Sequence, residues 1–383
     1  MPTRHVHVIT PGDHFSPSTG SAIPTVVHGL AAAAPEHRAA VVVAHGTYAD
    51  RYDSADIIEY PPVVRHRLDR YVDAGLSRVA GARPMARREY ARTVAGQGAW
   101  ERSVIFAHNA PQLVPSIDSV QHIAVLYAHN DILRTYSPRE AARVLDRSAL
   151  IVCVSDALAG QLSTSLSPAL RERLRVVHNG VDTEFFTPRA DRVRGDALEV
   201  VFVGRVLRDK GPDVLIDAVR RLARPDVHLT VVGAEGFAPD APLTPYERSL
   251  RLAAEPIADQ ITMLPFVPRD RVAELLRSAD VVVVPSRWQD PFPLTVLEGM
   301  ASGAAVIASD IGGIPEAAGE AGILVAPGDV DALAGAIAAL ADDQTLLSAV
   351  SAACLRRARA NSWAVARERL DTVVAEFDRA QPA

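Results

Sequence analysis

The sequence is poor in lysine, cysteine and long apolar runs. Lys210 is the only lysine, although Lys and Arg together number 40 in 383 residues. The two cysteines, Cys153 and Cys354, have neither zinc nor redox spacing, so a reducing cytoplasm is the expected setting. No apolar stretch is long enough to span a bilayer. The N-terminus runs straight into a strand pattern and lacks the regions of a signal peptide. These absences favour a cytoplasmic protein.

The overall charge and composition exclude some classes of function. A formal net charge of -6 argues against a general nucleic-acid binder. Hydrophobic residues make up 48% and charged residues 22%, which is ordinary for a globular enzyme. The length predicts two domains or one large one.

Short apolar runs alternate with helical patterns along the whole chain. Continuous Val/Ile/Leu runs, as opposed to alternating ones, are typical of parallel strands covered on both faces. The pattern therefore predicts an α/β fold. A polar, proline-containing stretch at 187–198 reads as a linker between two α/β halves, and 364–380 reads as a final long helix. The expected strands are 6–10, 39–44, 104–107, 123–127, 150–154, 200–203, 229–232, 281–284, 305–308 and 322–325.

Residues 63–102 are rich in arginine. One interpretation is a docking surface for an anionic acceptor or a membrane. The interpretation favoured by the interspersed acids is a solvated helical face. The arginines are Arg65, Arg67, Arg70, Arg78, Arg83, Arg87, Arg88, Arg92 and Arg102.

The lone lysine lies in a segment suited to phosphate. Residues 204–211 read Gly-Arg-Val-Leu-Arg-Asp-Lys-Gly, between an apolar run and a helical pattern. Arg205 and Lys210 would place two positive charges beside a helix N-terminus, which suits a diphosphate. Arginine does not substitute for lysine where a compact ammonium meets a phosphate. The alternative is a surface helix start with incidental charge.

A later segment carries carboxylates at another strand end. Asp290 and Glu298 bracket a loop and the first turns of a helix. There they could accept hydrogen bonds from sugar or ribose hydroxyls. The alternative is that their negative charge is only stabilised by the dipole of the helix N-terminus. A glycine-rich turn follows at 310–316. The Asp329 and Asp331 pair follows Pro-Gly and is predicted to cap a helix, not to bind a metal.

A glycine loop at 10–21 follows the first strand and leads into a helical pattern. Such a loop can bind phosphate through free backbone N–H groups, although an ordinary turn is an equal alternative. Its spacing is not G-x-G-x-x-G, which disfavours a nicotinamide dinucleotide.

Taken in order, these segments resemble the nucleotide-sugar site of glycosyltransferase family 4. The resemblance covers nearly the whole chain, is strong after about residue 120 and is thinner from 45 to 120. The motifs are Gly204-Arg205 to Lys210-Gly211, Asp290 to Glu298, Gly312-Gly313-Ile314-Pro315-Glu316, His178-Asn179-Gly180-Val181-Asp182 with Phe185, and Asn361-Ser362-Trp363.

The resemblance implies a GT-B fold of two Rossmann-like domains facing across a cleft. The N-terminal, acceptor-side domain would comprise residues 1–187 plus 364–383, because the final helix would cross back to it. The C-terminal, nucleotide-sugar-binding domain would comprise 188–363.

The resemblance also implies roles for individual residues. Arg205 and Lys210 would hold the diphosphate and stabilise the leaving group. Asp290 would contact the donor sugar, and His129 would lie near the reacting sugar carbon. The remaining donor-binding positions would be Gly20, Gly204, Phe266, Val267, Glu298 at the ribose, and the amides of Leu294 and Thr295. His108 is a further candidate on the acceptor side.

Three positions depart from the family pattern. Asp290 stands where glutamate is usual, which shortens the reach of the carboxylate. Gly20-Ser21 stands where two glycines are common. Pro293 replaces a frequent glycine and offers no N–H to a phosphate.

The expected function is a retaining glycosyltransferase that needs neither metal nor cofactor. The donor would be a nucleoside diphosphate sugar, with uridine as the first expectation and guanosine as the second. The acceptor is expected to be a small soluble molecule, with a lipid or polysaccharide as the alternative. A GT-B-fold nucleotide-sugar epimerase and a non-catalytic sugar-nucleotide binding module are the other hypotheses.

Overall fold

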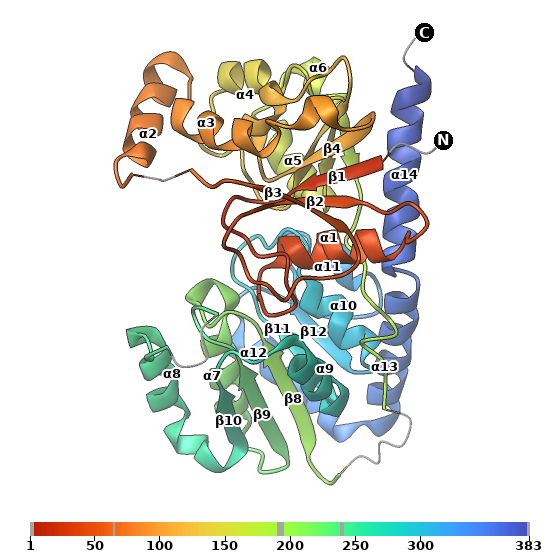
Figure 1. Cartoon of the computed structure of the whole chain (residues 1–383). Helices are drawn as coiled ribbons and strands as arrows, with labels where there is room; N and C mark the ends of the chain where they lie inside the picture. The colour runs from red at the N-terminus through yellow and green to blue at the C-terminus, as the bar shows by residue number, and fades with distance from the viewer. Residues whose placement is uncertain (1–3, 64–65, 190–194, 238–240, 381–383) are drawn as a thin grey trace. The chain divides into compact units, whose positions relative to one another are not determined.

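The computed structural model describes residues 4–63, 66–189, 195–237 and 241–380 (Figure 1). Its contacts divide the chain into two compact units. Unit 1 comprises 1–178 and 364–383, and unit 2 comprises 179–363.

Unit 1 is built on a seven-stranded sheet in the order β3-β2-β1-β4-β5-β6-β7. Every neighbouring pair is parallel, with Val6 opposite Ile105 at the centre. The central strands are buried along their whole length, as continuous apolar runs require. The strands are β1 (Arg4–Val8), β2 (Ala40–Ala44), β3 (Asp56–Tyr60), β4 (Ser103–His108), β5 (Ile123–Ala128), β6 (Leu150–Cys153) and β7 (Leu174–Val176).

The helices of unit 1 connect these strands. The final helix, α14, packs in this unit, where the Arg367 guanidinium donates to the backbone oxygen of Leu30 at 3.1 Å. The helices are α1 (Ala22–Ala32), α2 (Asp69–Ala80), α3 (Pro84–Thr93), α4 (Pro138–Leu145), α5 (Asp156–Ser163), α6 (Pro168–Arg171) and α14 (Trp363–Ala380), with 3-10 turns at Gln97–Ala99 and Pro111–Ser116.

Unit 2 is built on a six-stranded parallel sheet in the order β10-β9-β8-β11-β12-β13. The strands are β8 (Leu198–Val203), β9 (Val227–Val232), β10 (Ile261–Leu264), β11 (Val281–Val284), β12 (Ala305–Ser309) and β13 (Ile323–Val325). The helices are α7 (Pro212–Leu222), α8 (Pro245–Ala254), α9 (Arg269–Ser278), α10 (Leu294–Ala301), α11 (Ile314–Ala318), α12 (Val330–Asp342) and α13 (Gln344–Arg359), with 3-10 turns at Arg208–Lys210 and Glu255–Gln260.

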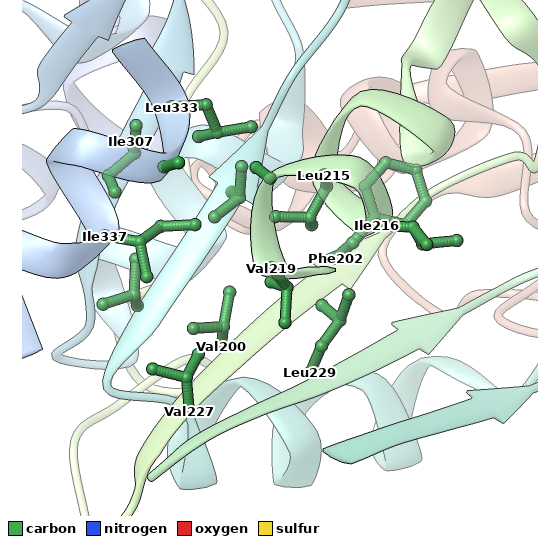
Figure 2. Packing of buried hydrophobic residues seen from close by; sticks show 14 of the residues in the cluster. Val200, Phe202, Leu215, Ile216, Val219, Val227, Leu229, Ile307, Leu333 and Ile337 are labelled. Atoms are coloured by element: carbon green, nitrogen blue, oxygen red, sulfur yellow. The ribbon is translucent and has the colours of Figure 1, made fainter. Parts of the chain in front are cut away.

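The core of unit 2 lies between its sheet and the helices α7 and α12. Phe202 and Leu229 from the strands meet Leu215 from α7, while Ile307 meets Ile337 from α12 (Figure 2). These side chains are at most 3% exposed. Burial of these apolar side chains away from water is the main contribution to the stability of the unit. It thereby fixes the strand ends and the loops that follow them.

The division between the units falls at 178/179, whereas the sequence placed it at 187. Residues 179–187 pack with unit 2: Val181 bridges Ser362, and the backbone oxygen of Phe185 accepts from Arg277 at 2.9 Å. Part of the expected linker, residues 190–194, lies outside the described residues.

Asp329 caps α12 by accepting the N–H of Ala332 at 2.9 Å, as predicted. Among the described residues, no single helix combines the length and apolarity needed to cross a membrane. The helices α12 and α13 pass that test only as a pair, bent by 107° at their junction.

Candidate functional site

The candidate site residues of unit 2 gather at one edge of its sheet. Gly204 directly follows β8, and the loop to Asp290 follows β11. Phe266 follows β10, and Gly312 follows β12. Because all these strands are parallel, their carboxyl ends meet at the same edge, where ligands bind in open α/β sheets. Four segments that are far apart in sequence therefore lie together.

The lone lysine forms an ion pair with Asp290. Nζ of Lys210 contacts Oδ2 of Asp290, and the two side chains are 28% and 8% exposed. The same ammonium lies 5.5 Å from the centre of the Trp288 ring. An ammonium has three N–H donors and a carboxylate has two oxygens. No other hydrogen bond to either charged group occurs among the described residues, so both partners keep capacity for a ligand.

Two glycines permit the backbone path that brings this pair together. Gly211 has a φ of +70°, and a Cβ there would lie 2.0 Å from the backbone oxygen of Pro285. Gly312 has a φ of +60°, and a Cβ there would lie 2.6 Å from the backbone oxygen of Asp290. That oxygen accepts the N–H of Gly313 at 2.8 Å. The loop after β12 therefore anchors the backbone of the acidic residue.

Glu298 is held by an arginine that the sequence reasoning missed. Nη2 of Arg269 donates to Oε1 of Glu298 at 2.8 Å, and the glutamate side chain is 8% exposed. Arg269 also lies over the rings of Phe185 and Phe186, at 5.9 and 5.0 Å. It begins α9, two residues after Val267. The signal in the sequence was its place directly after Phe266 and Val267, two of the expected donor-binding positions.

Arg205 makes contacts other than those of the lysine pair. It is exposed, and its Nε donates to the backbone oxygen of Glu235 at 2.9 Å. Its guanidinium lies 5.8 Å from the Phe237 ring, which meets Phe266 edge to face at 5.7 Å. No ion pair of Arg205 with Asp290 occurs among the described residues. Of the two expected diphosphate ligands, only Lys210 is thus paired with the acid.

A small pocket opens beside this aromatic pair. It has a volume of about 100 Å³ and lies beyond the ends of β9 and β10. Gly233, Glu235, Leu264 and Pro265 are among its lining residues. The walls of the pocket are mostly apolar, and its volume is large enough to receive part of a flat ring.

The N-terminus of α10 offers backbone donors. Pro293 precedes the helix and provides no side-chain cap, and Leu294 and Thr295 are half-buried. The first N–H groups of a helix have no partner within the helix. They carry partial positive charge, which suits an anion.

The histidines of unit 1 form a buried hydrogen-bonded chain. Nδ1 of His7 is 2.9 Å from Nε2 of His108, and Nδ1 of His108 is 2.8 Å from Nε2 of His129. His7 and His108 have no exposed surface, and His129 is 8% exposed. Burial lowers the pKa of His7 and of His129 to about 3, and it lowers that of His108 well below its usual value. All three rings are therefore neutral at pH 7.

His108, the acceptor-side candidate, is the middle ring of this chain. It has no exposed surface, and its Nδ1 contacts Nε2 of His129. The backbone N–H of His129 donates to Oδ1 of Asn109 at 2.7 Å, which holds the turn after β5. Sequence alone does not show that rings at positions 7, 108 and 129 meet.

The chain of bonds has a favoured direction. Nε2 of His7 is buried and has no partner among the described residues. A buried N–H without a partner is rarer than a buried acceptor without one. The favoured arrangement has Nδ1–H of His7 donating to His108, and Nδ1–H of His108 donating to His129. His129 then carries its own proton on Nδ1.

Gly20 lies in an exposed loop just before α1, at the carboxyl side of β1. It belongs to unit 1, as His129 does. The expected site residues therefore form two groups, one at the carboxyl edge of each sheet.

The chain is similar in sequence to known glycosyltransferases over part of its length. Residues 197–343 match the family described as "Glycosyl transferases group 1". The chain is 34% identical over 247 residues to D-inositol 3-phosphate glycosyltransferase 1 of Catenulispora acidiphila, covering 60% of this chain and 59% of that protein. It is 31% identical over 227 residues to spore coat protein SA of Bacillus subtilis, covering 54% of this chain and 60% of that protein. The chain thus spans about three fifths of the length of these relatives.

Solved structures share the fold over nearly the whole chain. Anabaena Alr3699/HepE, in complex with UDP and glucose, has a TM-score of 0.73 at 17% identity and covers 99% of this chain and 100% of its own. Sucrose-phosphate synthase from Thermosynechococcus elongatus has a TM-score of 0.75 at 19% identity, with coverage of 99% and 100%. The expected two-domain GT-B fold is confirmed. The sequence match to the group 1 glycosyltransferases covers residues 197–343, within the part of the chain where the motifs give the strongest resemblance.

Proposed function

We propose that this protein is a retaining glycosyltransferase that takes a sugar from a nucleoside diphosphate sugar without a metal. The observation that carries the proposal is the Lys210–Asp290 pair at the carboxyl edge of the unit 2 sheet. In this pair, a cation suited to phosphate is hydrogen-bonded to a carboxylate that can accept hydrogen bonds from sugar hydroxyls. The Alr3699/HepE structures contain UDP, UDP-glucose or UDP and glucose, which supports uridine as the base.

The proposed donor pose follows from the groups that remain available. Lys210 and Arg205 would neutralise the diphosphate, together with the N–H groups of Leu294 and Thr295. Asp290 would accept hydrogen bonds from the sugar hydroxyls. The second oxygen of Glu298 would accept from the ribose, while Arg269 fixes its first. Phe266, Val267 and the adjoining pocket would flank the base.

Catalysis in this proposal depends on position and electrostatics. The leaving diphosphate gains charge as the bond to the sugar breaks, and a fixed ammonium stabilises that charge without reorganisation. For His129 and Gly20 of unit 1 the proposed roles are those that the resemblance implies. The acceptor is proposed to be a small soluble molecule, with a lipid or polysaccharide as the alternative.

The test is turnover of a panel of nucleoside diphosphate sugars by wild type and two variants. Lys210→Ala should lower donor turnover by at least about 100-fold, which corresponds to about 2.7 kcal/mol of lost charge stabilisation. Arg208→Ala is the matched control: it removes an exposed cation from the same turn that stacks on Tyr246, 4.9 Å away. Near-normal turnover by Lys210→Ala would refute the proposal.

A further inference from the structure

Helix α2 has its apolar face turned outward. Five large apolar side chains between positions 68 and 79 are exposed by 40% or more: Leu68, Tyr71, Val72, Leu76 and Val79, the last by 90%. At 100° per residue these positions span an arc of roughly 140° on one side of the helix. Isolated exposed apolar residues are ordinary, but a contiguous stripe marks an interaction surface.

The opposite face of the same helix makes the contacts with unit 1. Asp73 is buried, and its carboxylate oxygens accept the N–H groups of Met85 and Ala86, both at 2.9 Å. Ala74 and Ser77 are half-buried on that side. Asp73 therefore caps α3, which is next to α2 at the margin of unit 1 (Figure 1). The helix is anchored by a polar face and presents its apolar face to the outside, the reverse of an ordinary surface helix.

Positive charge surrounds this apolar stripe. Residues 66–92 contain seven arginines and three acids, a net charge of +4 in a chain whose net charge is -6. Arg67 and Arg78 border the stripe on its Tyr71 side, by helical position. Both are exposed, as are Arg87 and Arg88 of α3, and none of the four has an ion pair among the described residues.

We infer that α2 docks on the surface of an anionic lipid bilayer, with the stripe from Leu68 to Val79 inserted at the interface. An interfacial helix has an apolar face for the acyl boundary and basic residues for the headgroups. Arginines near such a surface add attraction to anionic lipid. Excess positive charge beside the stripe, in a chain that is otherwise acidic, favours this occupant over a second copy of the chain.

The inference does not depend on the proposed reaction, because docking requires no donor. It has a consequence for that reaction. A transferase held at a bilayer would have amphiphilic acceptors within reach, which would favour the lipid alternative over a small soluble acceptor.

The test is co-sedimentation of the full chain with vesicles, without a donor. The vesicles are phosphatidylcholine alone, or phosphatidylcholine with 30% phosphatidylglycerol. Wild type should bind the anionic vesicles at least about tenfold more tightly than the neutral ones, and added salt should weaken this preference. The Leu76→Asp/Val79→Asp variant should lose at least about tenfold in binding to either. Leu252→Asp, at a 64% exposed leucine of α8, is the matched control and should bind as wild type does.

A second variant separates charge from insertion. Arg67→Gln/Arg78→Gln/Arg87→Gln/Arg88→Gln should abolish the anionic preference and retain the weak binding to neutral vesicles. Failure of wild type to bind anionic vesicles, or equal binding by Leu76→Asp/Val79→Asp, would overturn the inference. A dimer in solution that Leu76→Asp/Val79→Asp dissociates, without vesicle binding, would show that a second copy covers the stripe.

Discussion

Acid should unfold unit 1 through its buried histidines. His7 and His129 have a pKa of about 3 in the folded chain because burial opposes their charged form. In the unfolded chain an exposed histidine titrates near 6.5. Below that pH the unfolded state binds protons that the native state cannot bind. The free energy of unfolding therefore falls as pH drops from about 6.5 towards 3.

The size of the effect follows from the two shifts. In this window each ring lowers the free energy of unfolding by about 1.4 kcal/mol for each pH unit below 6.5. At pH 5 each ring therefore lowers it by about 2 kcal/mol, and the two together by about 4 kcal/mol. His5 and His108 act in the same direction, since burial lowers the pKa of each well below its usual value. Domain stabilities are about 5–15 kcal/mol. Unit 1 should therefore lose much of its stability between pH 6.5 and 5.

The two buried cysteines allow each unit to be followed separately. Cys153 lies in β6 of unit 1 and Cys354 in α13 of unit 2, and neither has exposed surface. Labelling with a pyridyl disulfide, which reacts with thiols in acid, can be read by peptide mass spectrometry along a urea series. The urea concentration at which half of Cys153 is labelled should fall steeply from pH 7 to 5.

A variant pair tests the origin of the slope. His7→Phe keeps a ring stacked on Phe106, 4.9 Å away in the native chain, and should flatten the pH dependence by about 1.4 kcal/mol per unit. His66→Gln, at an exposed position, should leave it unchanged. A Cys153 midpoint that hardly moves between pH 7 and 5 would show that the buried histidines do not control the acid stability of unit 1.

Three other outcomes are expected. Gly211→Ala should destabilise unit 2 by about 3 kcal/mol or more, because its Cβ would meet the Pro285 oxygen. The control Gly335→Ala, in open space on α12, should instead stabilise unit 2 by about 0.5–1 kcal/mol in the same urea titration. Glu298→Gln should reduce the preference for UDP over 2′-deoxy-UDP by about tenfold or more in calorimetry, and an unchanged preference would remove the ribose role. Nitrogen-15 spectra of histidine-labelled protein should show the proton of His129 on Nδ1, whereas a proton on Nε2 would reverse the direction assigned to the histidine chain.

The sequence predicted the interior of each sheet better than its edges. All ten expected strands are present, because buried parallel strands read as continuous apolar runs. The three missed strands are β3, β7 and β10, and each is the outermost strand of its sheet. Their residues are mostly half-buried, so Asp, Glu, Arg and Thr interrupt the apolar pattern.

The candidate site residues were proposed where short motifs follow a strand. Lys210 was proposed from a segment that begins at Gly204 and ends at Gly211, and Asp290 and Glu298 were proposed from a loop and a helix start. Arg269 was missed because its role depends on a contact across helices. The outward face of α2 was not foreseen either. The apolar spacing at 68–79 predicts a helix with one apolar face, but it does not indicate whether that face points inward or outward.

Lys210 is proposed to lie at the diphosphate of a bound donor. It is the only lysine, so an amine-reactive reagent can modify only Lys210 and the N-terminal amine. Labelling rates at the two amines can be compared by mass spectrometry with and without saturating UDP. UDP is expected to slow modification of Lys210 by at least about tenfold and to leave the N-terminal rate unchanged. Equal modification of Lys210 with and without UDP, under conditions where UDP binding is shown by calorimetry, would contradict this placement of Lys210.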